Sequence, residues 1–305
     1  MRSIWLVFLL LSACAPTLSS TEKDPIIPGA TSHTLPFTGY TTYFETLGNG
    51  RPVLLLHGIG GGSSLFQYRK NADALVDAGF KVYALDLLGF GRSSRPAIRT
   101  TQELLVRQLE SFLETVPASP TAVVANGLSA AYAIRIAAEQ PQLISKLVLV
   151  SPTGYGRLSR PQNQDRVVEF DRFRGILGNL LNAFLLDPGS QRFFLLDAYA
   201  GINSLTPEVV RSYDSNLRVE NAQWVIFSFI SGNLDQSVQA YWPRVDQPTL
   251  ILWGEEASNT PIGDAQDFIE IRPDKTLLPV RGVKLLPNED RPGFFNRIVS
   301  EFLLR

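Results

Sequence analysis

The stretch TAVVANGLSAAYA, residues 121–133, has the pattern of a strand, a tight turn and a helix, a place where a nucleophilic side chain can be presented. Ser129 lies just after the turn. A serine hydroxyl becomes a strong nucleophile when a neighbouring base, most often histidine, takes its proton. The chain has two histidines, His33 and His57, and none follows residue 57. The turn therefore has a candidate nucleophile but few candidate bases.

Strands and helices alternate along most of the chain. Short apolar runs such as RPVLLLHG (51–58) are typical of strands buried on both faces, and amphipathic segments such as residues 100–116 follow them. Residues 155–240 break this alternation, because they are helical in pattern and rich in aromatic side chains. We expect an α/β fold with a mainly parallel sheet and helices on both faces, built from residues 31–154 and 241–305. The helical insertion should lie over the carboxyl edge of the sheet, where ligands bind.

Four motifs together resemble those of the α/β-hydrolase family in its capped form. HGIGGGSS (57–64) resembles the family's oxyanion-hole loop, and DLLGFGRSSRP (86–96) resembles the turn after its fourth strand. PTLILWGEE (248–256) is similar to the strand that leads to the catalytic acid, and EDRPGFFNRIVSEFL (289–303) is similar to the last helix. The resemblance covers residues 31–305 and implies the α/β-hydrolase fold.

The family's chemistry needs a serine on the turn, a histidine and an acid. The resemblance places these three at Gly127, Leu285 and Ala257, so no catalytic residue of the triad is intact. A register shift of two residues would make Ser129 the nucleophile. It would then lie in the first turn of the helix, and we interpret it as a helix-start residue.

The remaining polar groups of this region have expected roles of their own. His57 should hold the oxyanion-hole loop, and His33 should be a solvated surface residue near the N-terminal segment. By resemblance, the backbone N–H groups of Ile59 and Leu128 form an oxyanion-type pair. Such a pair can hold a carbonyl or carboxylate oxygen. With apolar residues around it, the site would suit a small apolar ligand with one polar end.

The composition argues against several other classes of function. The net charge of −1 gives no global attraction to nucleic acid. The sequence has no GxGxxG fingerprint after its first strands and no GxxxxGK[ST] motif. It also has no histidine, cysteine and carboxylate cluster with the spacing of a metal site. We therefore expect no metal, no cofactor and no nucleic-acid partner.

The N-terminus, MRSIWLVFLLLSAC, has a basic start and an apolar run that is too short to span a bilayer. LSAC resembles the lipobox of bacterial lipoproteins. The resemblance implies removal of a signal peptide at 1–13 and attachment of diacylglycerol, with acyl chains such as palmitate, to Cys14, the chain's one cysteine. Residues 14–30 would form a tether. Ala15 is not the aspartate of inner-membrane retention, so we expect the outer membrane where the cell has two.

These observations favour a membrane-anchored α/β-hydrolase-fold lipoprotein that is catalytically inactive and binds a small apolar ligand or a protein partner of the cell envelope. An alternative is an active ester-type hydrolase with a non-standard active site, using Ser129 with a carboxylate base such as Glu256 or Glu289. A third hypothesis is a structural or interaction module of the envelope. Whether the chain is an enzyme stays open at this point.

Overall fold

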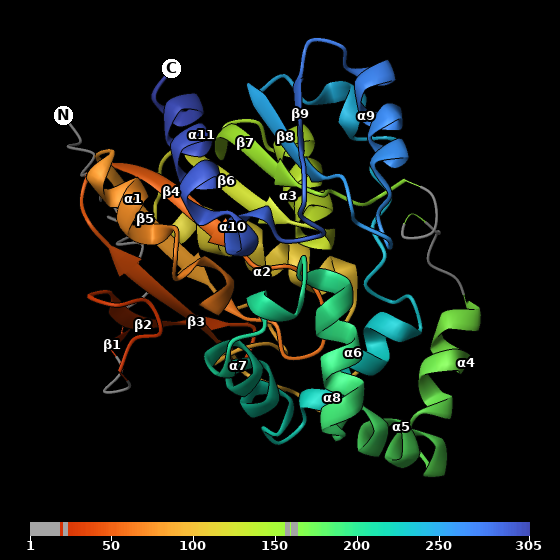
Figure 1. Cartoon of the computed structure of the whole chain (residues 1–305). Helices are drawn as coiled ribbons and strands as arrows, with labels where there is room; N and C mark the ends of the chain where they lie inside the picture. The colour runs from red at the N-terminus through yellow and green to blue at the C-terminus, as the bar shows by residue number, and fades with distance from the viewer. Residues whose placement is uncertain (1–18, 21–23, 156–158, 160–163) are drawn as a thin grey trace, which may run out of the picture.

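The structure is a computed structural model and describes residues 19–20, 24–155, 159 and 164–305 (Figure 1). The expected signal peptide, Cys14 and part of the expected tether lie outside the described residues. In the part of the chain that is described, no helix combines the length and the apolar character needed to cross a bilayer.

One sheet forms the centre of the molecule. Its strands are β1 (Ser19–Ser20), β2 (Thr31–Phe37), β3 (Tyr40–Leu47), β4 (Arg51–Leu56), β5 (Phe80–Leu85), β6 (Thr121–Asn126), β7 (Ile144–Val150), β8 (Thr249–Gly254) and β9 (Thr276–Val280). They lie in the order β1-β2-β3-β5-β4-β6-β7-β8-β9. The pairs from β5 to β9 are parallel, and those that join β1, β2, β3 and β5 are antiparallel. The prediction of a mainly parallel sheet is confirmed.

Helices cover both faces of this sheet. They are α1 (Ala72–Asp77), α2 (Gln102–Thr115), α3 (Leu128–Glu139), α9 (Ala265–Ile271), α10 (Pro287–Asp290) and α11 (Pro292–Leu304). Short 3₁₀ helices lie at Leu65–Tyr68, Ile202–Ser204, Trp242–Arg244 and Ile262–Asp264. Helix α2 begins where the Thr101 hydroxyl accepts a hydrogen bond from the Leu104 N–H.

The apolar run of β4 shows why the sheet needs helices on both sides. Its side chains alternate between two cores, because successive residues of a strand point to opposite faces. Leu54 and Leu56 join one core with α2 and α3, whereas Val53 and Leu55 join the other with α1 and α11. All four side chains are fully buried. This arrangement fixes the carboxyl ends of β4 and β6 side by side.

Between β7 and β8 the chain forms a helical cap. Its helices are α4 (Gln164–Arg172), α5 (Ile176–Leu186), α6 (Pro188–Ala198), α7 (Pro207–Leu217) and α8 (Ala222–Ile230). Figure 1 shows them gathered along one edge of the sheet. A buried ion pair, Arg166 Nη1 to Asp235 Oδ2 at 3.0 Å, ties α4 to the segment after α8. The predicted cap insertion is confirmed, and its exact limits at 155 and 240 stay predictions.

Candidate active site at the strand-to-helix turn

The turn between β6 and α3 keeps the backbone of a nucleophile elbow at Gly127. This residue has φ +56° and ψ −121°, a conformation that glycine adopts with little strain and that other residues adopt rarely. A Cβ atom added at Gly127 would meet no heavy atom within 4 Å. The predicted elbow is therefore present, with open space above it, and it carries no side chain.

Two backbone N–H groups lie in the segments that meet at this turn. Leu128 follows Gly127 as the first residue of α3, and Ile59 lies in the loop after β4. Among the described residues, no acceptor receives a hydrogen bond from either N–H group. The first N–H groups of a helix have no partner within the helix and favour negative charge. The structure thus leaves the expected oxyanion-type pair free to bind an oxygen atom.

Ser129 does not occupy the place of a nucleophile. Its side chain is fully buried, and its hydroxyl donates to the His57 carbonyl oxygen at 2.6 Å. This bond fastens the loop that carries Ile59 to the helix that carries Leu128. Ser129 is the second residue of α3, in agreement with its interpretation as a helix-start residue.

His57 is also committed to the fold. Its Nε2 accepts from the Leu87 N–H at 3.1 Å, so the proton sits on Nδ1, which donates to the Gly58 carbonyl oxygen at 2.8 Å. The ring is fully buried, and burial lowers the pKa of His57 to about 4. A neutral imidazole with both nitrogens bonded cannot serve as a base for the turn. Its predicted role in holding the oxyanion-hole loop agrees with this geometry.

His33 lies elsewhere, on β2, and three strands separate β2 from β6, so the two strands are four spacings apart in the sheet. At a strand spacing of about 4.8 Å this is a separation of roughly 19 Å. Its ring stacks on Phe44 with centroids 5.0 Å apart, and its Nε2 bonds the Thr46 hydroxyl at 2.9 Å. The expectation of a solvated surface histidine is therefore wrong, because the β2–β3 pairing shields one side of the ring.

The expected acid and base positions lie in two loops that touch each other. Ala257 is buried three residues after β8, and Leu285 is partly exposed in the loop between β9 and α10. The loops are joined by the Glu256 N–H, which donates to the Val283 carbonyl oxygen at 3.0 Å. The end of α6 covers them, because the Leu285 N–H donates to the Ala198 carbonyl oxygen at 3.0 Å. No ionisable side chain stands at either position.

A buried polar network lies beside the elbow, and the sequence reasoning did not identify it. Gln67 is its centre: its Oε1 accepts from the Gly58 N–H at 2.8 Å and from Asn126 Nδ2 at 3.3 Å. Its Nε2 donates to the Tyr213 hydroxyl of α7 at 2.9 Å. Asn288 Nδ2 closes the network by donating to the Gln67 carbonyl oxygen at 2.7 Å. The network therefore holds the elbow, the oxyanion-hole loop and the cap in one arrangement.

The two carboxylates considered as bases are not placed for that role. Glu256 is exposed to solvent in the turn after β8. Glu289 is buried and pairs with the Arg69 guanidinium and with Lys70 Nζ at 3.0 Å. Burial raises the pKa of Glu289, and the two cations oppose this rise. A carboxylate held by two cations is a structural anchor rather than a free base.

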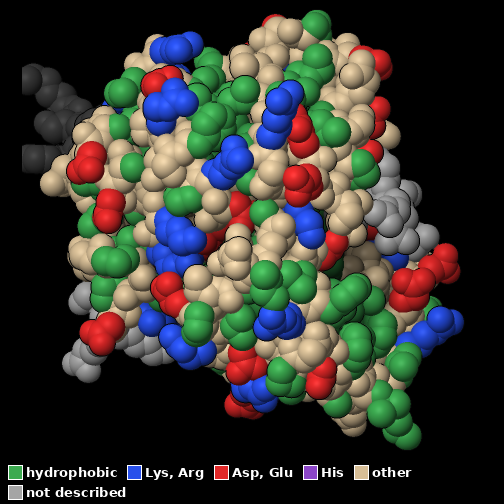
Figure 2. Space-filling model, in the orientation of Figure 1, with side chains coloured by type: hydrophobic (Ala, Val, Ile, Leu, Met, Phe, Trp, Pro, Cys, Tyr) green, Lys and Arg blue, Asp and Glu red, His purple; other side chains and the backbone are tan. Residues whose placement is uncertain are grey.

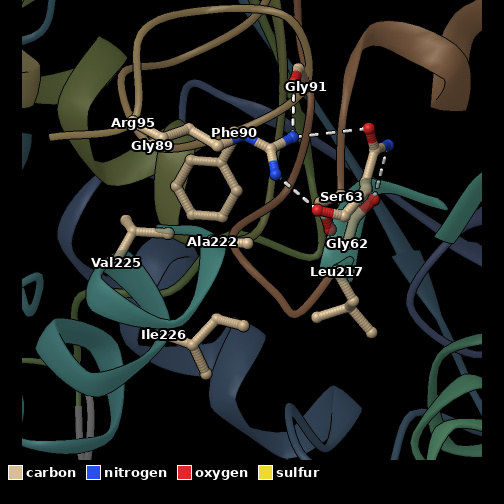
Figure 3. Close-up of a pocket in the computed structure, with 11 residues that line it drawn as sticks. Gly62, Ser63, Gly89, Phe90, Gly91, Arg95, Leu217, Ala222, Val225 and Ile226 are labelled. Carbon is tan, nitrogen blue, oxygen red and sulfur yellow. Dashed lines mark hydrogen bonds between the residues drawn. The ribbon is translucent and has the colours of Figure 1, made fainter. Parts of the chain in front are cut away.

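A second hollow lies where the cap meets the loop after β5 (Figure 3). It is a cavity of about 10 Å³, which is room for about one water molecule. Arg95 reaches across it and donates to the carbonyl oxygens of Gly91 and Asn216. Gly127, Ala257 and Leu285 do not line this cavity. Among the described residues, no group of histidine, cysteine and carboxylate side chains could hold a metal ion.

Comparisons with known proteins agree with this architecture. The model of a family described as alpha/beta hydrolase fold matches residues 51–280. A 2-hydroxy-6-oxo-6-(2'-aminophenyl)hexa-2,4-dienoic acid hydrolase from Metapseudomonas resinovorans is 25% identical over 241 residues, which are 77% of this chain and 78% of the relative. A 2-hydroxy-6-oxononadienedioate/2-hydroxy-6-oxononatrienedioate hydrolase from a Pseudomonas species is 24% identical, over 85% of this chain and 90% of the relative.

A solved structure of a serine hydrolase involved in carbazole degradation, the CarC enzyme, superposes with a TM-score of 0.75. It covers 90% of this chain and 100% of its own, at 19% identity, so it supports the fold alone.

The names of the sequence relatives contradict the prediction of a catalytically inactive, ligand-binding protein, because these relatives are hydrolases. That prediction depended on the residues at 127, 257 and 285 and on the absence of any histidine after residue 57. Loss of those side chains removes one catalytic route but leaves the free N–H pair and the open space above the turn. The relatives favour the alternative, an active hydrolase with a non-standard active site.

Proposed function

Because the chain belongs to the alpha/beta hydrolase fold family, we propose that it is an active hydrolase of small carbonyl compounds with a non-standard active site. One observation carries the proposal: the space above Gly127 is open, and the N–H groups of Ile59 and Leu128, in the two segments that meet at this turn, donate to no acceptor among the described residues. Donors fixed in advance toward a developing oxyanion are often the largest single contribution to acyl-transfer catalysis. The elbow thus keeps this contribution without its side chain.

We propose water as the nucleophile, because the turn itself carries no side chain. With the substrate carbonyl oxygen bound to the N–H pair, a water oxygen adds to the carbonyl carbon. The bond to the leaving group then breaks, and a proton from the water passes to that group. Thr153 lies beside the elbow, since its N–H donates to the Gly127 carbonyl oxygen at 3.3 Å. Its buried hydroxyl has no hydrogen-bond partner among the described residues, which leaves it available to a bound water.

The residues around Leu285, where the core meets the cap, indicate that the substrate has an apolar body. Leu285 packs against an apolar cluster that joins the core to the cap, formed by Phe66, Leu195, Tyr199, Val209, Tyr213 and Leu286. Such a wall gains free energy by covering apolar surface of a substrate. The relatives act, by name, on 2-hydroxy-6-oxo-dienoic acids. We propose a substrate of comparable chemistry, an ester or an oxo acid with an apolar body.

Filling the space above the turn should abolish turnover. We expect Gly127→Leu to lower kcat/KM by roughly a hundredfold or more, because the side chain would displace the carbonyl from its N–H donors. Gly127→Ala is the matched control. Both variants carry the same cost of a positive φ, about 1–2 kcal/mol, but alanine adds little volume. The measurement is hydrolysis of a panel of aryl esters and 2-hydroxy-6-oxo-dienoic acids, with thermal unfolding as the check on folding.

Two results would overturn the proposal. One is turnover by the unmodified protein that does not exceed the uncatalysed rate for any compound of the panel. The other is a Gly127→Leu variant that remains folded and retains the turnover of Gly127→Ala, since the carbonyl would then be bound elsewhere.

We also propose that the chain is exported and anchored to a membrane through an acylated Cys14. The support is the sequence of residues 1–14, with its basic start, its apolar run and LSAC. The intact mass of protein extracted from membranes should match a chain that begins at Cys14 and carries acyl groups. A mass that includes residues 1–13, or an unmodified Cys14, would refute the anchor.

A further inference from the structure

An apolar surface on the cap faces solvent. Helix α5 has no charged residue from Ile176 to Leu186. Ile176, Leu180 and Phe184 repeat every four residues and therefore lie on one face of the helix. Their exposed fractions are 80%, 64% and 51%. Packing inside the domain therefore does not explain why this face of α5 is apolar.

Helix α6 extends the same surface. Phe193 and Phe194 are 68% and 48% exposed. Phe194 contacts Phe184 of α5 edge to face with ring centroids 6.1 Å apart, and Phe193 at 5.6 Å. Figure 2 shows hydrophobic side chains gathered at the lower right, where α5 lies in Figure 1. We name this surface, formed by Ile176, Leu177, Leu180, Phe184, Phe193 and Phe194, the cap face. Continuous apolar surface on a soluble domain marks an interaction site.

Charges around the cap face nearly balance. Arg172, Arg174 and Arg192 are exposed near it, and so are Asp171 and Asp187. Arg174 Nε pairs with Asp171 Oδ1 at 3.2 Å. A surface of this kind has no strong electrostatic preference. Its free energy of binding would come from burial of apolar side chains, as when an amphipathic helix lies in a membrane interface.

The N-terminal sequence indicates what covers this face. Residues 4–11 are apolar, and Cys14 ends the LSAC motif. The chain joins the domain at Ser19, which pairs with Thr34 of β2, and it is held again at Asp24, whose carbonyl oxygen accepts from Arg92 Nη1 at 2.6 Å. The five residues from Cys14 to Ser19 span at most about 18 Å. For a domain of this length the radius of gyration is about 19 Å, so an anchor at Cys14 would hold it against the membrane.

We propose that the cap face inserts into the surface of a lipid bilayer and is a second membrane contact, independent of Cys14. The exposed rings and aliphatic side chains of α5 and α6 enter the boundary between head groups and acyl chains, and the flanking arginines remain among the head groups. Since membrane contact needs no turnover, this inference does not depend on the proposed hydrolase activity.

The test measures vesicle binding by the mature chain, residues 14–305, in a Cys14→Ser background, because acylation or the apolar run of residues 4–11 would bind every variant. Vesicles of phosphatidylcholine, alone or mixed with phosphatidylglycerol, are the probe. The test variant is Ile176→Asp with Leu180→Asp. The matched control is Ile271→Asp with Leu304→Asp, at exposed positions of α9 and α11 outside the cap. We expect the test pair to lower the partition coefficient about tenfold or more on both vesicle types, because charged side chains insert poorly. The control should change it less than about twofold.

Equal binding by the test and control pairs would overturn the inference, and so would absence of binding by the unsubstituted Cys14→Ser chain. Size-exclusion chromatography tests whether a second copy of the chain binds the cap face instead. If the chain is a dimer that the test pair converts to a monomer, and no vesicle binding is seen, the cap face is a contact between two copies. Binding to the mixed vesicles alone would indicate attraction by the arginines and would also contradict apolar insertion.

Discussion

Glu289→Ala is expected to lower the free energy of unfolding by about 3–5 kcal/mol, because it leaves a buried cation without its partner. Glu289 of α10 faces the Arg69 guanidinium, whose side chain is 7% exposed, and Lys70 Nζ at 3.0 Å. Lys70 is 36% exposed and can turn to water, so most of the loss should come from Arg69. Urea unfolding of the full chain measures it.

Glu208→Ala is the matched control, since Glu208 pairs with the same guanidinium. Its carboxylate lies 3.1 Å from Arg69 Nε but is 60% exposed, and exposed pairs contribute about 0–1 kcal/mol. We expect a loss within that range. If the two variants lose the same free energy of unfolding, the buried Glu289 pair stabilises the protein no more than the exposed Glu208 pair does.

The ion pair also positions the site. Glu289 follows Asn288, whose amide donates to the Gln67 carbonyl oxygen, and Gln67 in turn binds the oxyanion-hole loop and Asn126. A carboxylate suggested by the sequence as a base therefore acts at a distance from the chemistry. Glu289→Ala should reduce turnover, because the donors above Gly127 would be held less firmly. The pH profile of turnover should keep its shape, because Glu289 is not the base of the reaction.

The sequence predicts the turn well because its determinants are local. A buried strand, a glycine and a helix rich in alanine follow one another within residues 121–139, and the structure has β6, Gly127 and α3 in that order. The alternation of parallel strands and helices along the chain can be predicted for the same reason, since each apolar run is followed by an amphipathic segment. By contrast, the pattern of β2 is weak, because Pro36 and several polar residues interrupt its alternation.

The polar network could not be predicted in the same way. Gln67 is 59 residues from Asn126 and 221 residues from Asn288 in the chain, and only the fold brings them together. The aromatic residues of the cap illustrate the same limit. Their composition suggests a wall above a ligand, yet Phe170 is fully buried while Phe193 is 68% exposed. Composition gives the apolar content of a helix but not which side meets water.

Gly91→Ala should be among the most damaging single substitutions in the core, with an expected loss of more than about 4 kcal/mol. Gly91 has φ +48°, and an added Cβ would lie 2.0 Å from the carboxyl carbon of Asp86. That carboxylate is fully buried and accepts from the Leu65 and Arg92 N–H groups at 2.7 Å each. Burial nevertheless raises the pKa of Asp86 to about 6. Moving the carboxylate away from an added Cβ would break these two hydrogen bonds.

Gly39→Ala separates the clash from the backbone strain. Gly39 has φ +82°, and an added Cβ would meet nothing within 4 Å. We expect this control to lose only the cost of a positive φ, about 1–2 kcal/mol. The difference between the two variants in urea unfolding then measures the close approach of Gly91 to Asp86. A Gly91→Ala variant as stable as Gly39→Ala would mean that the Asp86 loop repacks, and that the glycines of DLLGFGRSS serve the turn rather than the carboxylate.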